Sequence, residues 1–430
     1  MVKLGNYQRS VSIIGVGCTP WMRIMDDPET IGLTENELFG YAAIEAMKDA
    51  GIEGKDIQYY FHGQAMPIFT SDYMTANVQV GDWFGARGCG SIAHSEGCCT
   101  GYLALELAVQ AVASGKYDIV LSGCVDMADT RFIPGKPAHM RKRLTAQEFL
   151  PCVNFCFDRA YGRYASAGNE LAFDTPLEDY IQTYGITDDD MDDALIGAAM
   201  SNRKNACKNP LALHRESYEE IAEEEEFDSA YDYLKSYYNP KLSEFLRGSG
   251  GEERCEGAAA VIVCPTEMAY KYTDKPILVL GTGNSVVNQI HPHNERIATE
   301  EACRQIYELT GVKPEDIDLL LTNDFTISSQ LTSGEATGYL PKGEGWKYLR
   351  DGKTAYDGEK PINSGGGRTS FGHAHGASGM ADVYEAVKQM RGEAGEHQIN
   401  KVPKTVLLRG YGGAQNVSAT ILRTPEEKGE

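Results

Sequence analysis

Two short segments of this 430-residue chain hold the residue types needed for covalent acyl transfer. The first, GSIAHSEGCCTGYLALELAV, places Cys98 where a small-residue loop enters a long helix with apolar periodicity. Unpaired backbone N–H groups and the positive end of the helix dipole at such an entrance stabilise a thiolate. Gly97 and Gly101 would let the backbone approach a ligand closely. Cys98 is therefore the candidate nucleophile, and the alternative is a buried structural thiol.

The second segment, NSGGGRTSFGHAHGASG, places His373 and His375 just before another predicted helix. CCTGYLALELAV, which starts at Cys98, returns as GASGMADVYEAV at Gly376, and His373 lies three residues before that start. If two halves of the chain pack about a pseudo-twofold axis, both helix entrances converge. A thiol then meets an imidazole, which are the nucleophile and base of acyl transfer.

Repeated elements along the chain would provide such an axis. AGIEGKDIQYY at Ala50 returns as TGVKPEDIDLL at Thr310, and each copy runs into a short apolar strand. The opening strands SVSIIGVG and PILVLGTG and the closing strands YDIVLSGCV and KTVLLRGYGG keep the same order. This pattern predicts two α/β halves of like topology, related by duplication. Two unrelated but similar α/β domains are the alternative.

A different kind of sequence separates the halves. From residue 128 to residue 250 the strand pattern fades, which predicts an inserted, mainly helical lobe that shapes the substrate pocket. The strand EGAAAVIVC after the lobe is expected to be the last strand of the first half. The predicted division is residues 1–127 with 251–270, residues 128–250, and residues 271–430.

Composition excludes several functions. Lys and Arg number 40 against 62 Asp and Glu, so the net charge is −22, which disfavours binding to nucleic acid or an anionic membrane. No apolar run approaches a membrane span and no signal-peptide core is found, so we expect a cytoplasmic protein.

Metal-binding patterns are incomplete. Cys152 and Cys156 form a CxxxC pair, and His291/His293 and His373/His375 form HxH pairs. None has a matching second half at zinc-ligand spacing, so no metal is predicted.

Taken together, these residues resemble the thiolase superfamily, and its sterol-carrier-protein-type branch in particular, over nearly the whole chain. Cys98-Cys99-Thr100-Gly101 is similar to the motif Cys-x-Ser-Gly, and Gly372 to Gly379 resembles Gly-His-Pro-x-Gly-Ala-Thr-Gly. SNRKNACKNPLA, from Ser201 to Ala212, and CEGAAAVIV also match this branch. The resemblance implies a five-layered αβαβα sandwich.

The same resemblance assigns roles to residues. Cys98, rather than Cys99, inherits the role of nucleophile, and His373 that of base and oxyanion-hole donor. The backbone N–H groups of Cys98 and Gly412 would stabilise the oxyanion of the acyl-enzyme.

The chain departs from the family where a second Cys normally protonates the departing carbanion. Gly410-Tyr411-Gly412 and Thr322-Asn323-Asp324-Phe325 occupy the two places where that thiol occurs. The proton donor is therefore open among Asp324, His375, Cys99 and Cys124. Asn323 lies one residue from where related enzymes hold an oxyanion-hole water.

The implied reaction is cleavage of a 3-oxoacyl-CoA by coenzyme A, a co-substrate, with no permanently bound cofactor. Within this branch the chain resembles the large subunit of benzoylsuccinyl-CoA thiolases, which implies cleavage of 2-benzoylsuccinyl-CoA to benzoyl-CoA and succinyl-CoA. Residues compatible with an aromatic ring and a free carboxylate are Tyr161, Tyr164, Tyr180, Tyr184, Arg159, Arg163 and Arg203. The alternative for each is packing within the lobe.

Coenzyme A is a polyanion, so an acidic protein must concentrate positive charge locally to bind it. The candidate coenzyme A-binding residues are Arg141, Arg143, Arg203 and Lys204. The resemblance also implies a homodimer of this subunit that binds a small zinc-ribbon and OB-fold subunit, as a heterotetramer.

Three rival functions remain. A dinucleotide dehydrogenase would need a third Gly where Pro20 follows Gly15 and Gly17, so its fingerprint is incomplete. A thiolase-like retro-aldolase needs no acylated Cys, and Cys98 argues against it. A catalytically silent acyl-CoA-binding scaffold would not make Cys98 more reactive than the other ten thiols.

Overall fold

The computed structural model describes residues 8–65, 67, 75–131, 133, 136–137, 139–144, 170–287, 293–412 and 416–425. Seven candidates from the sequence lie outside these ranges: Cys152, Cys156, Arg159, Tyr161, Arg163, Tyr164 and His291. Within the ranges, no helix is long and apolar enough to cross a membrane.

The first half consists of strands alternating with helices. Its elements are β1 (Val11–Cys18), α1 (Glu35–Ala50), the 3-10 turn η1 (Gly54–Asp56), β2 (Tyr59–Gly63), α3 (Ala76–Phe84), β3 (Gly90–His94), α4 (Thr100–Ala113), β4 (Val120–Met127) and β7 (Glu256–Pro265). Local signals delimit α1, because the Thr34 side chain caps its start and Gly51, at φ 67°, ends it.

The glycines of IIGVGC serve packing between β1 and α1. A Cβ atom on Gly15 would lie 2.3 Å from Ala46 O, and one on Gly17 would lie 2.2 Å from Ala42 O. Both distances are far below van der Waals contact, so only glycine allows this close approach. Gly15 and Gly17 are therefore explained by helix packing and do not support the hypothesis of a dinucleotide-binding loop.

The second half repeats the first. Its elements are β8 (Ile277–Val286), α11 (Asn294–Thr310), η3 (Pro314–Asp316), β9 (Leu319–Thr322), α12 (Ser328–Ala336), α13 (Gly345–Arg350), the π-helical turn η4 (Gly367–Phe371), α14 (His375–Arg391), η5 (Gly395–His397), β10 (Thr405–Gly412) and β11 (Asn416–Arg423). An isolated parallel bridge between Leu320 and Ile362 stands where the first half has β3.

One nine-stranded sheet runs through both halves in the order β3-β2-β4-β7-β1-β8-β11-β10-β9. Outward from the junction, β1-β7-β4-β2 corresponds to β8-β11-β10-β9. The outer pairs β2–β4 and β9–β10 are parallel, and the halves join where Val11 to Ile13 pair antiparallel with β8. The predicted fold class of two duplicated α/β halves is confirmed. The late strand of the first half is confirmed too, because β7 lies between β4 and β1.

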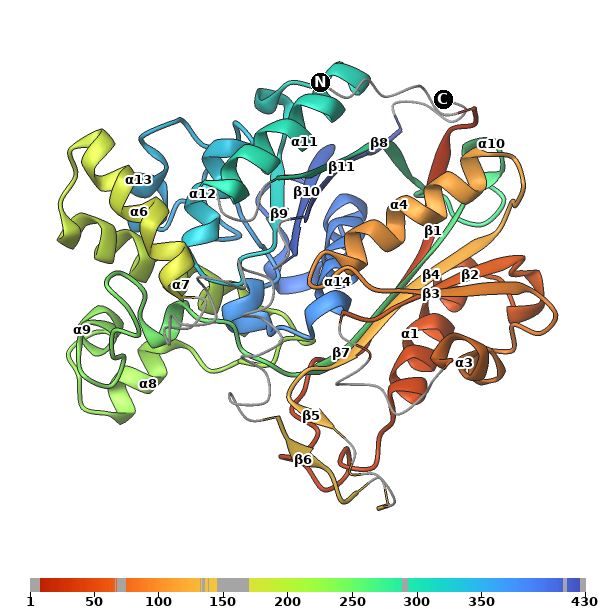
Figure 1. Cartoon of the computed structure of the whole chain (residues 1–430), viewed down its shortest axis with the longest axis horizontal. Coiled ribbons are helices and arrows are strands. Elements are labelled where there is room, and N and C mark those ends of the chain that lie inside the picture. The colour runs from red at the N-terminus through yellow and green to blue at the C-terminus, as the bar shows by residue number, and fades with distance from the viewer. Residues whose placement is uncertain are drawn as a thin grey trace.

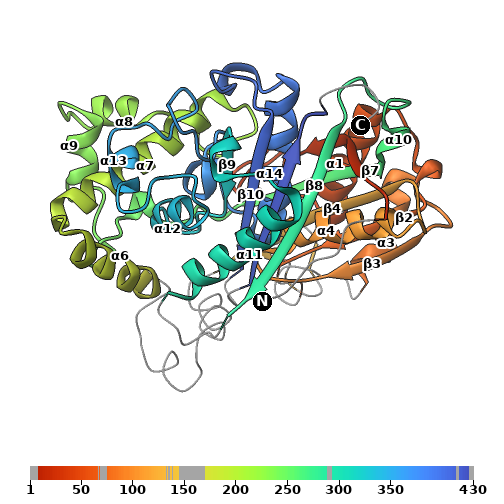
Figure 2. The same cartoon turned by 90° about the horizontal axis from the view of Figure 1, so that it is seen from above.

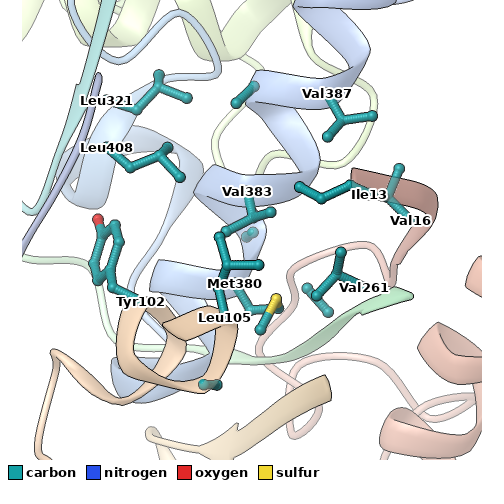
Figure 3. Packing of buried hydrophobic residues seen from close by; sticks show 14 of the residues in the cluster. Ile13, Val16, Tyr102, Leu105, Val261, Leu321, Met380, Val383, Val387 and Leu408 are labelled. Carbon is teal, nitrogen blue, oxygen red and sulfur yellow. The ribbon is translucent and has the colours of Figure 1, made fainter. Parts of the chain in front are cut away.

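Helices α4 and α14 pack against each other between the two parts of the sheet (Figures 1 and 2). Helices α1 and α3 cover the outer face of the first half, and α11 covers β8 and β11 of the second. In Figure 3, Leu105 of α4, Met380 of α14 and Val261 of β7 point into one shared core. Full burial of each such side chain contributes about 1.5–3 kcal/mol. This core fixes the two central helices, and with them their N-termini.

The region between β4 and β7 is mainly helical in its described part. It contains the short hairpin β5 (Thr130–Arg131) and β6 (Lys142–Arg143), and the helices α6 (Glu170–Tyr184), α7 (Asp188–Lys208), α8 (Tyr218–Glu224) and α9 (Ala230–Lys235). Leu177 and Met191 share a buried cluster with Leu331 and Leu349 of the second half. This packing ties the helical region to the second half; the division at residues 128 and 250 stays a prediction.

Candidate active site

The N-termini of α4 and α14 meet through glycines. A Cβ atom on Gly101 would lie 2.3 Å from Met380 N, and one on Gly376 would lie 2.8 Å from Thr100 Cβ. The two helix entrances therefore converge, as the repeated sequence predicts. The role of Gly101 differs from the expected one, since its missing side chain makes room for α14 and not for a ligand.

Cys98 lies in the loop that enters α4. The loop is held by Thr100, whose hydroxyl accepts from Glu96 N at 2.9 Å and donates to Gly97 O at 2.6 Å. Gly97 has a φ of 55°, which glycine adopts at little cost. Cys98 is partly exposed, whereas Cys99 is buried and burial raises its pKa to about 12. Of these two thiols, Cys98 is the one that a substrate can reach.

Gly412, at the end of β10, lies directly beside this loop. A Cβ atom on Gly412 would be 2.9 Å from Glu96 O and 3.4 Å from Cys99 N. Asn323 donates from Nδ2 to Tyr411 O at 2.6 Å, and so fixes the backbone next to Gly412. The Gly412 backbone is thus near Cys98, and the side-chain amide of Asn323 is hydrogen-bonded to the backbone of Tyr411.

His373 is fully buried just before α14. Its Nδ1 forms a 3.0 Å hydrogen bond with Ser378 Oγ, and its backbone N–H donates to Glu253 O at 2.7 Å. Its Nε2 lies 3.3 Å from Glu252 Oε2. Burial, helped by the nearby His375 and Arg368, holds the pKa of His373 well below its usual value. The ring is therefore neutral at pH 7 and able to accept a proton.

His375 is the first residue of α14 and has a φ of 33°, which is unusual for a residue with a side chain. Its ring centroid lies 5.1 Å from that of His373, at 79°. Burial lowers the pKa of His375 to about 3. Ligand atoms of Glu252, His373 and His375 all lie within 4.8 Å of one another, so these three could share a metal ion. The sequence does not indicate a third ligand for this HxH pair, whereas in the structure Glu252 lies close enough to be one.

Asp324 is fully buried and holds the loop before His373. It accepts from Asn202 Nδ2, Gln330 Nε2 and Arg368 N, each at 2.8 Å. Burial raises its pKa. These contacts anchor η4, and the role of Asp324 as one of the four candidate proton donors stays a prediction.

The SNRKNACKNPLA segment forms the C-terminal part of α7 and the turn after it, and it clamps the same loop. Asn205 Nδ2 donates to Asn363 O at 3.0 Å, and Asn209 Nδ2 donates to Gly365 O at 3.2 Å. The inserted region thus orients the loop that carries His373.

The four basic candidates do not form one surface. Arg203 is buried, stacks on the Tyr218 ring at 4.4 Å and donates to Ser370 Oγ at 3.2 Å. Lys204 pairs with Asp357 at 2.7 Å, and Arg143 pairs with Asp26 and Asp129. Arg141 and Arg143 lie on or beside β6, whereas Arg203 and Lys204 lie on α7. Arg203 and Lys204 are thus bonded to other residues of the chain, and the binding of coenzyme A by these four residues stays a prediction.

Two carboxylates at the site escaped sequence analysis. Glu252 contacts His373 from a segment 121 positions away, and no motif marks it. Asp126, at the end of β4, accepts from Ala65 N at 3.0 Å and Gly376 N at 2.8 Å. Burial raises the pKa of Asp126 to about 7. Asp126 thus ties the first half to the entrance of α14.

A cavity of about 340 Å³ lies between α6, α11 and α12. Tyr180 and Tyr184 line it together with Arg296 and Tyr411, the neighbour of Gly412. Tyr180 donates its hydroxyl to Glu335 at 2.6 Å. Two of the four tyrosines singled out in the sequence therefore face one cavity.

Comparisons with known proteins agree with this geometry. Residues 284–424 match the family model described as Thiolase C-terminal domain-like. The chain is 30% identical over 419 residues to the benzoylsuccinyl-CoA thiolase subunit BbsB of Thauera aromatica, covering 94% of this chain and 95% of that one. It is 29% identical over 416 residues to an acetyl-CoA acetyltransferase of Methanothermobacter thermautotrophicus, covering 95% and 98%.

Solved structures show the same fold. The Ltp2-ChsH2(DUF35) aldolase superposes with a TM-score of 0.74 at 21% identity, over 97% of this chain and 98% of that one. Human mitochondrial 3-ketoacyl-CoA thiolase superposes with a TM-score of 0.67 at 14% identity, over 97% and 100%. With the 30% identity to BbsB over nearly the full length of both chains, the chain belongs to the thiolase family of acyltransferases.

Proposed function

We propose that the protein is a thiolase that cleaves a 3-oxoacyl-CoA with coenzyme A through an acyl group on Cys98. One observation supports this proposal: two helix entrances converge at glycines, and one entrance carries the partly exposed thiol of Cys98 while the other carries the buried, neutral imidazole of His373. A thiol with a nearby base is the minimum equipment for covalent acyl transfer.

The reaction begins when His373 accepts the proton of Cys98. The thiolate attacks the 3-oxo carbon, and collapse of the adduct breaks the bond between C2 and C3 and leaves an acyl-CoA enolate. After the enolate is protonated, the thiol of coenzyme A attacks the acyl group on Cys98 and releases the second acyl-CoA. The same groups run the reaction in either direction.

Backbone donors would stabilise the oxyanion of the acyl-enzyme. We assign this role to the N–H groups of Cys98 and Gly412, because Gly412 lies beside the Cys98 loop. Asn323 holds Tyr411 and so keeps the Gly412 N–H in place. A preorganised donor of this kind contributes about 2.7–4 kcal/mol to catalysis.

For the substrate we propose 2-benzoylsuccinyl-CoA, which would give benzoyl-CoA and succinyl-CoA. The support is the name of the relative BbsB and the cavity lined by Tyr180 and Tyr184. Aromatic side chains of this kind pack well against a phenyl ring. Coenzyme A would bind near the basic residues Arg141 and Arg143. We also propose that the protein is cytoplasmic, where coenzyme A is available.

We further propose that two copies of this chain associate with a small zinc-ribbon and OB-fold subunit. BbsB is named as a subunit, and the aldolase neighbour is named with a DUF35 partner. Strand β3 lies at the edge of the sheet and leaves Ile92 48% exposed. An unpaired edge strand offers backbone groups to a second copy.

A retro-aldolase is the second candidate, because an aldolase shares the fold over nearly the whole chain. The two reactions differ in whether Cys98 is acylated. The test is to incubate the protein and its small partner with 2-benzoylsuccinyl-CoA and other 3-oxoacyl-CoAs, quench with acid and map peptides by mass spectrometry. We expect a benzoyl adduct on Cys98; cleavage without an adduct on Cys98 would favour the aldolase.

A further inference from the structure

Thiolysis leaves an enolate that must receive a proton at its carbon atom. In the described chain, the thiols nearest the site in sequence are poor donors. Cys99 is buried with its pKa raised to about 12, and Cys255 is buried behind Gly372, whose added Cβ would lie 2.7 Å from the sulfur. Asp324 is fully engaged with Asn202, Gln330 and Arg368.

Glu252 is differently placed. Its Oε2 lies 3.3 Å from Nε2 of His373, while Nδ1 of the same ring is bonded to Ser378. The side chain of Glu252 is 12% exposed, whereas that of His373 is fully buried. Oε2 of Glu252 and Nε2 of His373 are both buried, and they contact each other at the ring nitrogen that Ser378 does not occupy, without the geometry of a hydrogen bond.

We propose that Glu252 carries the proton from His373 to the enolate carbon. Glu252 would thereby take the role of the second Cys that normally protonates the carbanion in this family. This inference rests on the proposed thiolase reaction. It makes Glu252 a catalytic residue for the carbon–carbon step alone.

His373 Nε2 takes the proton of Cys98 and passes it to the Glu252 carboxylate. When the C2–C3 bond breaks, its electron pair moves to C2, which takes the proton from Glu252. In the second half, coenzyme A gives its proton to His373, and the departing Cys98 thiolate recovers that proton. Burial disfavours a lasting imidazolium at His373, which is a reason to hand the proton on.

Two partial reactions of the intact protein separate this role from others. Acylation of Cys98 by benzoyl-CoA needs His373 but no enolate. Exchange of the C2 hydrogens of succinyl-CoA or acetyl-CoA for deuterium in D2O needs a proton carrier at carbon. We expect Glu252→Gln to slow exchange by about 10²-fold or more and acylation by less than about tenfold. Glu252→Asp should recover part of the exchange.

Glu106→Gln is the matched control, because Glu106 is a partly buried carboxylate on α4 that bonds Gln110. It should leave both rates unchanged. Exchange in Glu252→Gln within threefold of the natural protein would overturn the proposal, as would equal loss of both reactions in the Gln and Asp variants. If the natural protein acylates Cys98 but shows no exchange, Glu252 has no such role; if it fails to acylate, the thiolase proposal itself fails.

The same assays are run with and without EDTA and with added Zn²⁺. Ligand atoms of Glu252, His373 and His375 lie close enough to share an ion. A proton carrier predicts exchange that EDTA does not change and that Zn²⁺ slows by occupying Glu252 and His373. Exchange that EDTA abolishes and Zn²⁺ restores would overturn the proposal.

Discussion

The entrances of α4 and α14 occupy equivalent places in the two halves, yet they present opposite surroundings to their key residues. Cys98 is partly exposed on a loop held by one threonine hydroxyl. His373 is fully buried, and Ser378, Glu253 and Glu252 surround it. A nucleophile must reach its substrate, whereas a base works best when it is held still and kept neutral. The two equivalent entrances thus differ in the way that the proposed roles of Cys98 and His373 require.

Removing the proposed nucleophile should have the largest effect on activity. Cys98→Ser leaves a hydroxyl that a neutral imidazole activates far less readily than a thiol, so cleavage should fall by about 10⁴-fold or more. Unfolding temperature should hardly change, since Cys98 is partly exposed. Steady-state kinetics and thermal unfolding measure both quantities. Cys207→Ser, at a partly exposed thiol on α7, is the control, and equal losses in the two variants would contradict the role of Cys98.

Changing the base should cost less, because some thiolate forms without it. We expect His373→Asn to lower the rate of Cys98 acylation by about 10² to 10⁴-fold. Its amide keeps polar atoms near Ser378, and circular dichroism can check that the fold is intact. If raising the pH restored none of the lost rate, the base role would be in doubt, because hydroxide can replace a missing proton acceptor.

The converging entrances could be predicted from sequence because both lie inside the repeated pattern. Loop, glycines and helix recur in order, and they locate Cys98 and His373 without any knowledge of contacts. The late strand β7 was predictable for the same reason, as an apolar run that completes the first half.

Residues that act across long separations could not be found this way. Glu252 meets His373 only because the backbone beside it pairs with the His373 segment, as the bridge from Arg254 to His373 records. The burial of Arg203 against Tyr218 could not be predicted, because the sequence does not show which charged residues are buried. The contacts of Asn323 and Asp324 could not be predicted either, since a motif does not show backbone partners such as Tyr411 O and Arg368 N.

The contact between the Cys98 loop and the end of β10 can be tested at Gly412. In Gly412→Ala the new Cβ atom would lie 2.9 Å from Glu96 O, so the Cys98 loop or β10 must move. We expect about a 10²-fold loss of kcat from a displaced oxyanion donor, and a stability loss of about 1–3 kcal/mol. Gly32→Ala is the control, because no atom lies within 4 Å of the added Cβ. A fully active Gly412→Ala would remove Gly412 from the oxyanion hole.

The smallest expected effect is on the pH dependence of stability, to which buried groups of the two halves contribute with opposite signs. Burial raises the pKa of Asp126 to about 7, so the folded protein binds a proton that the unfolded chain has lost above about pH 4. Stability from this group therefore falls between about pH 4 and 7. Burial lowers the pKa of His375 to about 3 and that of His373 well below its usual value, so these groups make stability rise from pH 3 to about 6.5.

Asp126→Asn removes the acidic contribution and leaves the histidines. The free energy of unfolding should then rise more steeply between pH 4 and 6.5 than in the natural protein, by up to about 1.4 kcal/mol per pH unit for one proton. Urea unfolding at several pH values measures the two slopes. The absolute stability of the variant will also be lower, since an amide cannot accept from both Ala65 N and Gly376 N as the carboxylate does, but a constant loss does not change a slope. Parallel curves for the two proteins would mean that Asp126 is already ionised in the folded state, and that the N–H groups of Ala65 and Gly376 outweigh the cost of burying its charge.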